Sequence, residues 1–302
     1  MSAFPQAISL SPPLAAKRDR LLEILTALGR VGVAFSAGVD STLVATAAHR
    51  ACGDRAVALT ARSASLAEGE LDEARALAAQ IGIRHEVVET DEFRDPNYLA
   101  NPVNRCYFCK SELYTRLETL APALGFDVIV NGANLDDLGD YRPGMTAARE
   151  HAVRSPLVEA GFTKQDVRDL ARAWGLPVWD KPAGPCLSSR LATGVAVTPE
   201  RVSRVDRAER FLRERFGLTE LRVRLEANEL ARIEVPVEAL GRLVAAEARD
   251  EVARFFLDAG FSEVTLDLRG FRSGGLGRRG LDGAKLPAGE LVALNPAPPS
   301  RP

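Results

Sequence analysis

One short segment, Ser36–Ser41, constrains this chain more than any other. It reads Ser-Ala-Gly-Val-Asp-Ser, it follows the apolar run Val31–Phe35, and an apolar stretch with helical spacing comes directly after it. A strand that turns straight into a helix gathers free backbone N–H groups and the positive end of the helix at one point, which suits a phosphate group. Gly38 lets the backbone approach such an anion closely, and the two serines can add hydroxyl donors.

An ordinary strand-to-helix turn with a serine cap would look similar, so the segment alone leaves both interpretations open. The string also resembles the SGGxDS signature of PP-loop pyrophosphatases, which split ATP into AMP and pyrophosphate, whereas no GxxxxGK[ST] sequence is present. Ala37 replaces the usual first glycine, and we expect a negative φ there. Asp40 is a predicted catalytic residue, which we expect either to orient the loop or to hold Mg²⁺. The resemblance implies that ATP is bound by Ser36, Gly38, Val39, Asp40 and Ser41.

The first 180 residues alternate between short apolar strands and helices. Strands that alternate with helices predict an α/β fold, a parallel sheet with helices on both faces, in which ligands gather at the carboxyl ends of the strands. Thr163 is the predicted N-cap of the last of these helices. We expect strands over 31–35, 56–60, 86–88 and 127–130, and helices over 17–29, 42–51, 66–81, 106–124 and 163–174.

The pattern changes after about Leu176, where a Pro- and Gly-rich stretch precedes a second set of elements. A charged helix (199–216), two strands (221–225 and 230–235), a helix (237–259) and a strand (263–268) predict a smaller C-terminal α+β domain. We therefore divide the chain into a flexible tail (1–16), a PP-loop ATP-binding domain (17–180), a cysteine-bearing loop (181–198), a substrate-binding domain (199–280) and a second flexible tail (281–302).

Two further strand ends offer contacts to ATP. In PP-loop enzymes the backbone after the second strand meets adenine, which here implies Thr60, Ala61 and Arg62. Gly132 follows the fourth strand and permits close approach near the ribose or α-phosphate. The same segment contains three carboxylates that can bind Mg²⁺: Asp136, Asp137 and Asp140. Asp137 is the candidate ligand. A solvated acidic loop is the alternative interpretation.

Three of the four cysteines stand in positions that suggest chemistry. Cys106 and Cys109 form a CxxC pair at the start of a helix, and Cys186 lies in a Gly/Pro-rich loop. Half of a zinc site, a redox pair and part of an iron–sulfur site all remain open. Three cysteines leave one iron of a four-iron cluster open to a non-protein ligand. Cys52 has apolar helical spacing and is expected in the core.

Cys186 is flanked in sequence by Lys181 and Arg190, and nearby cations favour the thiolate form. A buried loop cysteine is the alternative. A thiolate close to ATP suggests sulfur transfer, in which ATP adenylates an oxygen and sulfur then displaces AMP.

Four segments together resemble the LarE family: NRCYFCKSELY, NGANLDDLGDYRPGMTAARE, VRSPL and GPCLSSR. LarE proteins are ATP-dependent sulfur transferases that help to make the nickel-pincer nucleotide of lactate racemase, and the similarity runs from about residue 17 to 280. It implies that MgATP adenylates a carboxylate of pyridinium-3,5-biscarboxylic acid mononucleotide, that pyrophosphate leaves, and that sulfur then displaces AMP. It also implies a homo-oligomer.

The family uses two sulfur sources. In one, the cysteine that matches Cys186 gives up its own sulfur and becomes dehydroalanine. In the other, three cysteines hold a [4Fe-4S] cluster, and an extra sulfide on the open iron is delivered. Cys106, Cys109 and Cys186 favour the cluster, and the sacrificial route stays open.

The second domain carries Arg222 and Arg224 two residues apart on one strand, hence on the same face. Paired guanidinium groups suit a phosphate, and the family's matching arginines bind the substrate phosphate. A solvated strand face is the alternative. Arg269, Arg272 and Ser273 match another family segment, without an assigned role.

Composition limits the partners. The 302 residues carry 39 basic and 41 acidic side chains, a net charge of −2, which forces no basic face for nucleic acid. There is no apolar run of about 18 residues and no signal-peptide pattern, so we expect a cytoplasmic protein without a membrane partner. A PP-loop tRNA thiolase and a non-catalytic nucleotide- or iron–sulfur-binding protein are the alternatives.

Overall fold

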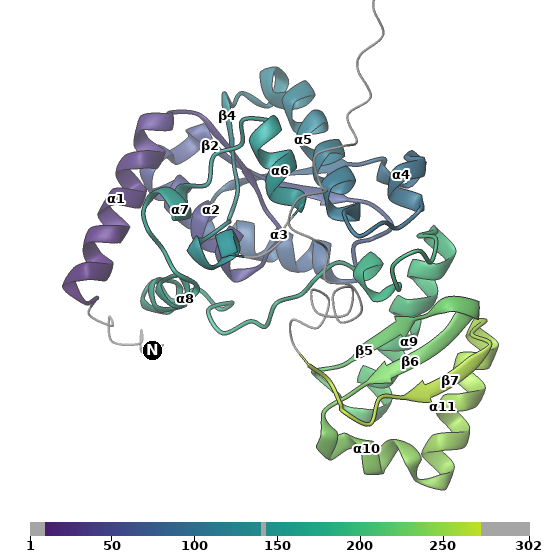
Figure 1. Ribbon diagram of the computed structural model, residues 1–302. Helices are drawn as coiled ribbons and strands as arrows, with labels where there is room; N and C mark the ends of the chain where they lie inside the picture. Colours follow the sequence, from purple (N-terminus) through teal and green to yellow (C-terminus); the bar gives the residue numbers. More distant parts are fainter. Residues whose placement is uncertain (1–9, 140–142, 273–302) are drawn as a thin grey trace, which may run out of the picture. The chain divides into compact units, whose positions relative to one another are not determined.

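Two separate β-sheets organise the residues that the computed structural model describes, 10–139 and 143–272 (Figure 1). The first sheet has the strand order β3-β2-β1-β4, and every neighbouring pair is parallel. This confirms the predicted parallel α/β fold. Its strands are β1 (Val31–Ala34), β2 (Ala56–Arg62), β3 (Arg84–Glu89) and β4 (Val128–Val130).

Helices cover both faces of this sheet, and β2 shows why. Side chains alternate across a strand: Ala56 and Ala58 belong to one apolar core, whereas Val57 and Leu59 belong to another. The first core also contains buried residues of α1 (Pro12–Leu28), α2 (Val39–Cys52), α3 (Glu70–Ile81), α7 (Pro156–Glu159) and α8 (Lys164–Ala173). The second contains residues of α5 (Arg105–Leu124) and α6 (Pro143–Glu150).

Several element ends differ from the predicted ones. Helix α1 begins at Pro12 rather than residue 17, so part of the predicted tail is helical; proline is well suited to a first helical position, and Leu14 is buried in the core. Thr163 caps α8 as predicted, because its side chain accepts a hydrogen bond from the Asp166 N–H in a capping box. Helix α6 was not predicted. The predicted tail 281–302 lies outside the described residues.

The second sheet has the order β5-β6-β7, with β5 (Arg222–Leu225) antiparallel to β6 (Leu230–Glu234) and β7 (Glu263–Leu266) parallel to β6. Residues of α9 (Pro199–Phe216), α10 (Val237–Val244) and α11 (Ala246–Ala259) pack with it around a third core. The predicted smaller α+β region is therefore present. The single helix predicted over 237–259 is two helices, because Ala245 has an extended ψ of 140°.

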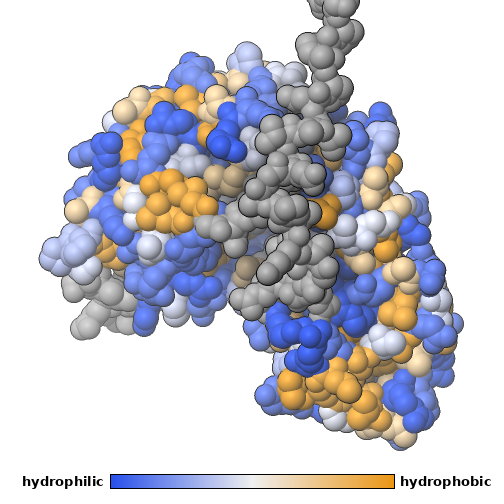
Figure 2. All heavy atoms as spheres, in the orientation of Figure 1, coloured by the Kyte–Doolittle hydropathy of each residue, from blue (hydrophilic) through white to orange (hydrophobic). Residues whose placement is uncertain are grey.

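The surface of this region carries exposed apolar groups. Val237 and Val244, at the two ends of α10, are 56% and 58% exposed, and Figure 2 shows apolar side chains gathered over α10. Among residues 10–139 and 143–272, no helix is both long and apolar enough to cross a membrane.

Candidate active site

The loop between β1 and α2 is braced by its own hydroxyl groups. Ser41 Oγ donates to the Gly38 carbonyl at 3.1 Å and accepts from the Ser36 N–H at 3.2 Å; Ser36 Oγ lies 3.2 Å from it. These bonds fix the turn before any ligand arrives. The two hydroxyl groups that we expected to donate to phosphate therefore also hold the shape of the loop.

The start of α2 is open to a ligand. Gly38 is the N-cap of α2, and no described side chain caps this helix end. A Cβ added at Gly38 would meet only Ser36 Oγ, at 3.5 Å. Free N–H groups in the first turn, with room beside them, are the features that bind anions at helix N-termini.

Ala37 corrects one expectation. Its φ is +55°, in the left-handed region, whereas we expected a negative φ. The loop keeps the conformation that a glycine would adopt there, and the alanine Cβ is accommodated with its side chain 2% exposed. A left-handed alanine costs roughly 1–2 kcal/mol, so the loop is held in this shape against a local preference.

Replacing Ala37 with Gly is expected to raise the free energy of unfolding by about 0.5–1 kcal/mol, since the relief of strain exceeds the extra chain entropy of glycine. Ala37→Val should lower it by about 1–3 kcal/mol, because a β-branched side chain fits poorly at positive φ. Urea unfolding measures both. Ala47→Gly, inside α2, is the control and should lower the free energy of unfolding by about 1 kcal/mol. A similar loss for Ala37→Gly would show that the backbone at Ala37 is not strained.

Gly132, after β4, lies against the phosphate loop. A Cβ at Gly132 would come within 2.8 Å of the Ser41 backbone nitrogen and 3.0 Å of the Asp40 carbonyl carbon. The need for glycine at this position therefore comes from the loop backbone itself. Its expected contact with ribose or the α-phosphate stays a prediction.

Asp40 has both carboxylate oxygens engaged. Oδ1 accepts from Asn134 Nδ2 at 3.0 Å, and Oδ2 accepts from Lys164 Nζ at 2.5 Å. Sequence reasoning missed Lys164 and Asn134, because 124 and 94 positions separate them from Asp40. The predicted magnesium candidates also bind nitrogen donors: Asp136 accepts from the Lys164 N–H and Asp137 from the Asn134 N–H, both at 3.0 Å. Asp140 lies outside the described residues.

The backbone of β2 runs past the end of β1. The last paired residues of these strands are Ala34 and Leu59, and the Leu59 carbonyl accepts from the Phe35 N–H. Because backbone groups of a strand point to alternate sides, those of Ala61 point toward the side that β1 no longer covers. Of the predicted adenine contacts, Thr60 bonds its hydroxyl to the Phe35 carbonyl at 3.0 Å, and Arg62 pairs with Glu89. Ala61 is thus the residue whose backbone is best placed for a base.

A second lysine borders the loop. Lys181 Nζ pairs with Glu73 at 2.6 Å and lies 3.4 Å from the Ala37 carbonyl oxygen. It also lines a cavity of about 490 Å³ between α3 and residues 177–181. None of the predicted ATP-binding residues lines this cavity.

The CxxC pair lies in the first turns of α5. Cys106 is exposed and Cys109 is partly buried. Burial is the main cause that raises the pKa of the Cys109 thiol to about 12; Lys110 opposes it, and the charges of Glu92, Cys186 and Cys106 add to it. Cys106 and Cys186 are therefore near enough to Cys109 to affect its charge, and the joint role of the three thiols stays a prediction.

The loop that carries Cys186 is anchored to the segment around α5. Tyr98 Oη and Ser188 Oγ are 2.7 Å apart, and Arg105 Nη1 donates to the Ser188 carbonyl at 2.7 Å. Arg105 also donates to Asn101 Oδ1, and Asn101 Nδ2 donates to the Ala192 and Val195 carbonyls. The sequence assigned no role to Tyr98, Asn101 or Arg105, and their role is visible only once the fold brings the loop to them.

Arg190 holds the other side of this loop. It forms a buried ion pair with Glu209, 3.0 Å between Nε and Oε1, and donates to the carbonyls of Pro185 and Cys186. The expected effect of Arg190 and Lys181 on the Cys186 thiol stays a prediction. The carboxylates of Glu209 and Glu73 engage these two cations, and Arg190 also fixes the loop backbone.

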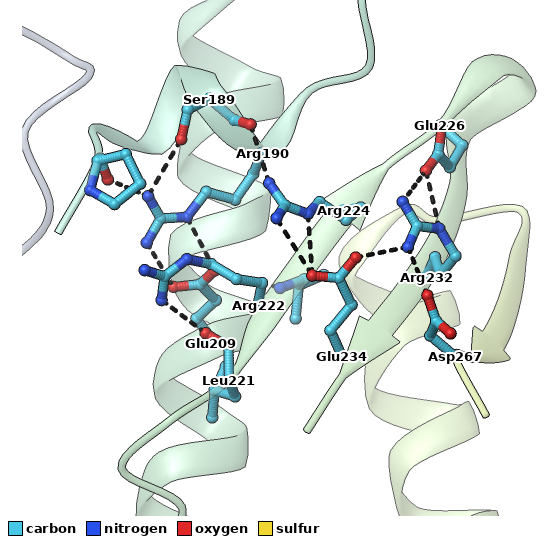
Figure 3. A network of polar contacts seen from close by, with 12 residues as sticks. Ser189, Arg190, Glu209, Leu221, Arg222, Arg224, Glu226, Arg232, Glu234 and Asp267 are labelled. Atoms are coloured by element: carbon cyan, nitrogen blue, oxygen red, sulfur yellow. Dashed lines mark hydrogen bonds and ion pairs between the residues drawn. The ribbon is translucent and has the colours of Figure 1, made fainter. Parts of the chain in front are cut away.

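The two arginines on β5 also reach this loop, and they differ from each other (Figure 3). Arg224 pairs with Glu234 at 3.1 Å and donates to the Ser189 carbonyl. Arg222 donates to the Leu221 and Ala183 carbonyls, at 2.8 and 3.3 Å. Burial, with a smaller contribution from the neighbouring Arg190, lowers the pKa of Arg222 to about 10. In the described part of the chain, Arg222 has no carboxylate partner, so it is the more available cation.

Glu92 is another residue that the sequence did not indicate. It is 2% exposed, and Oε1 accepts from Ser63 Oγ at 2.6 Å and Ser65 Oγ at 3.3 Å. Oε2 has no hydrogen-bond partner among the described residues.

The three residues of the C-terminal family segment have no assigned role. The Arg269 backbone N–H donates to Asp267 at 2.9 Å, Arg272 is exposed, and Ser273 lies outside the described residues.

Within 10–139 and 143–272, no three His, Cys, Asp or Glu side chains are gathered as ligands of one metal ion. Three thiols nevertheless match the chemistry of an iron–sulfur cluster, whose cysteines bind different iron atoms and need not converge on one point.

Comparisons with known proteins cover most of the chain. The asparagine synthase family model matches residues 22–104, which include the phosphate loop. The chain is 51% identical to an uncharacterised protein of Synechocystis sp., across 88% of this chain and 98% of the relative. It is 39% identical to the pyridinium-3,5-bisthiocarboxylic acid mononucleotide synthase of Lactiplantibacillus plantarum, across 86% of this chain and 94% of that enzyme.

A tRNA-specific 2-thiouridylase of Beijerinckia indica is 32% identical, but the match covers 60% of this chain and 53% of that enzyme. The match to the synthase, in contrast, extends over 262 residues, a length that exceeds the whole phosphate-loop domain. The chain belongs to the LarE family of PP-loop, ATP-dependent sulfur transferases.

Proposed function

We propose that this chain uses MgATP to activate a carboxylate of pyridinium-3,5-biscarboxylic acid mononucleotide and then exchanges AMP for sulfur. A carboxylate oxygen bonds to the α-phosphorus of ATP, and pyrophosphate leaves. A sulfur nucleophile then bonds to the acyl carbon, the bond to the AMP oxygen breaks, and a thiocarboxylate and AMP remain. Two rounds give the dithio compound, the precursor of the nickel-pincer cofactor. The name of the L. plantarum relative supports this substrate class.

The observation that carries the proposal is the double attachment of the Cys186 loop. Ser188 bonds to Tyr98 and Arg105 on the side of the CxxC helix. Ala183 and Ser189 accept from Arg222 and Arg224 on β5. One loop thus joins the cysteine that would carry sulfur to the arginines that would bind the substrate phosphate.

For ATP, we assign the pyrophosphate to the loop of Ser36, Gly38, Val39 and Ser41, and adenine to the backbone at Ala61. Mg²⁺ would arrive with ATP and keep several phosphate and water ligands, so that one or two carboxylates are enough. Asp137 is the proposed carboxylate.

For sulfur, we assign a [4Fe-4S] cluster to Cys106, Cys109 and Cys186. Such a cluster would supply a sulfide for transfer, and its three cysteine ligands would leave one iron free to bind it. The donor chemistry and the electrostatic proximity of the thiols support this assignment. If no cluster forms, Cys186 itself is the proposed sulfur donor.

The proposal is tested by supplying the biscarboxylate mononucleotide and MgATP to purified, anaerobically prepared protein. We expect pyrophosphate and AMP to appear, together with a product in which sulfur replaces oxygen, identified by mass spectrometry. Arg222→Gln should raise the KM for the mononucleotide about 10-fold or more, since a charge-assisted bond to phosphate is lost.

The effect of Arg222→Gln should vanish with the dephosphorylated nucleoside. Arg207→Gln is the control, because Arg207 is exposed and donates to the Ala259 carbonyl. Equal losses with both substrates would contradict the phosphate assignment. Turnover of a tRNA, without turnover of the mononucleotide, would favour the thiolase alternative.

Three further expectations belong to the proposal. The loop 181–198 separates the ATP-binding domain from the substrate-binding domain, the protein forms a homo-oligomer, and lactate racemase is the enzyme that finally receives the cofactor.

A further inference from the structure

We propose that Asp40 acts as a positioning residue for Lys164, and that the Lys164 ammonium binds the terminal phosphates of ATP and remains with the pyrophosphate as it leaves. This inference rests on the proposed activation of a carboxylate by ATP. It assigns a residue that sequence reasoning did not consider, and it gives Asp40 a role other than holding Mg²⁺.

The bonding of Asp40 is the first observation. One carboxylate oxygen accepts from Asn134 and the other from the Lys164 ammonium, at 3.0 and 2.5 Å. Both carboxylate oxygens therefore accept from donors of this chain, and the cation among these donors is Lys164.

The backbone of Lys164 is held in place independently of that ion pair. It is the first residue of α8, directly after the Thr163 cap, and its N–H donates to Asp136 Oδ2 at 3.0 Å. Val167, Leu170 and Ala171 of α8 are buried in the same core as Val44 and Ala48 of α2. The packing of α8 on α2 therefore keeps the base of the lysine at a fixed distance from the phosphate loop.

The side chain itself is less confined. The side chains of Lys164 and Asp40 are 34% and 25% exposed, so neither is enclosed by the core. Lysine is a compact charge on a flexible stem with three donors, and can contact Asp40 and an incoming oxygen together.

Charge explains why the loop needs this pair. Asp40 lies in the first turn of α2, beside the free N–H groups and the open side of Gly38. A polyphosphate bound there would meet the negative charge of Asp40 at short range. The Lys164 ammonium neutralises that charge and presents its own to the phosphates. Negative charge builds on the pyrophosphate as its bond to the α-phosphorus breaks, which a placed cation stabilises.

The test compares Lys164→Met, Asp40→Asn and the double variant by titration calorimetry and by pyrophosphate release. We expect Lys164→Met to weaken binding of ATP and of inorganic pyrophosphate about 10- to 100-fold while AMP binding is unchanged. Asp40→Asn should shift the same affinities in the same direction. The double variant should be no worse than Lys164→Met, because the two residues act as one unit.

The magnesium dependence separates the two roles of Asp40. If Asp40 positions Lys164, the Mg²⁺ concentration that gives half-maximal pyrophosphate release stays unchanged in all three variants. A several-fold rise in that concentration for Asp40→Asn alone would overturn the proposal and identify Asp40 as a metal ligand. Additive losses in the double variant would also overturn it.

Lys17→Met is the matched control. Lys17 pairs with Asp166 at 2.7 Å at the same end of α8, with 32% and 22% exposure, but does not contact the loop. It should keep wild-type affinity for ATP and pyrophosphate. Pyrophosphate affinity is measured without the biscarboxylate, so a failure of the proposed substrate would leave this test intact. Unchanged pyrophosphate binding in Lys164→Met would refute the lysine role alone.

Discussion

Cys186→Ala protein is expected to release pyrophosphate from ATP and the mononucleotide, yet to form the thiocarboxylate at a rate lower by about 10³-fold or more, as for the loss of a nucleophile that carries the transferred group. The reason is spatial. The ATP loop lies between β1 and α2, whereas Cys186 lies on a separate loop, where Tyr98 and Arg105 bond to Ser188 and Arg190 bonds to the Cys186 carbonyl. The activation step should therefore survive without the thiol. Pyrophosphate and product mass are measured in the same reaction.

Iron analysis of the same variants identifies the sulfur source. With a cluster, Cys106→Ala and Cys186→Ala should both lose most of the bound iron, and wild-type protein should keep its mass after turnover. With the sacrificial route, iron is absent throughout, and wild-type Cys186 is converted to dehydroalanine. Cys52→Ala is the thiol control, because Cys52 is buried under α1 and bonds to the Leu25 carbonyl at 3.3 Å. Loss of pyrophosphate release in Cys186→Ala would contradict the separation of the two steps.

Glu209→Gln is expected to lower the free energy of unfolding at pH 7 by about 3–5 kcal/mol, because it leaves the Arg190 guanidinium buried without its counter-charge. Arg190 and Glu209 are 6% and 1% exposed. Glu251→Gln breaks an exposed pair with Arg215 and should cost at most about 1 kcal/mol. Urea unfolding of both variants makes the comparison, and a similar small loss in each would contradict a tightly coupled buried pair.

The pH dependence of this effect follows from the carboxyl group. Burial raises the pKa of Glu209, but Arg190, Arg213 and the Val223 N–H together bring it below its ordinary value. A carboxyl with a lowered folded-state pKa contributes its stability above the unfolded-state pKa, about 4.3, and loses it as the pH falls through the folded-state value. The difference between wild type and Glu209→Gln should therefore shrink progressively below about pH 4.

Local signals in the sequence were enough for most elements of the fold. The phosphate loop, the parallel sheet and the Thr163 cap rest on short patterns whose cause lies within a few residues. Ser11 and Pro12 also carry a helix-start signal, but it was outweighed by the proline content of the first residues. The break at Ala245 has no such signal, because the surrounding residues are good helix formers and only packing of α10 and α11 decides it.

The site was harder to predict where distant segments meet. The register of β5 and β6 brings Arg224 to Glu234. The packing of α8 brings Lys164 to Asp40. Ala37 shows a different limit: its sequence suggests a backbone with negative φ, and the hydrogen bonds of Ser36, Gly38 and Ser41 override that preference.

The alternation of β2 has a consequence for how such an enzyme can change over time. Ala58 and Leu59 are neighbours in the chain, but Ala58 packs with α2, which carries the ATP loop, and Leu59 packs in the layer of α5, which carries the CxxC pair. A substitution in one layer need not disturb the other. With the roles proposed above, ATP activation and sulfur supply could therefore vary separately in evolution, so that a lineage could replace its thiols without redesigning its nucleotide site.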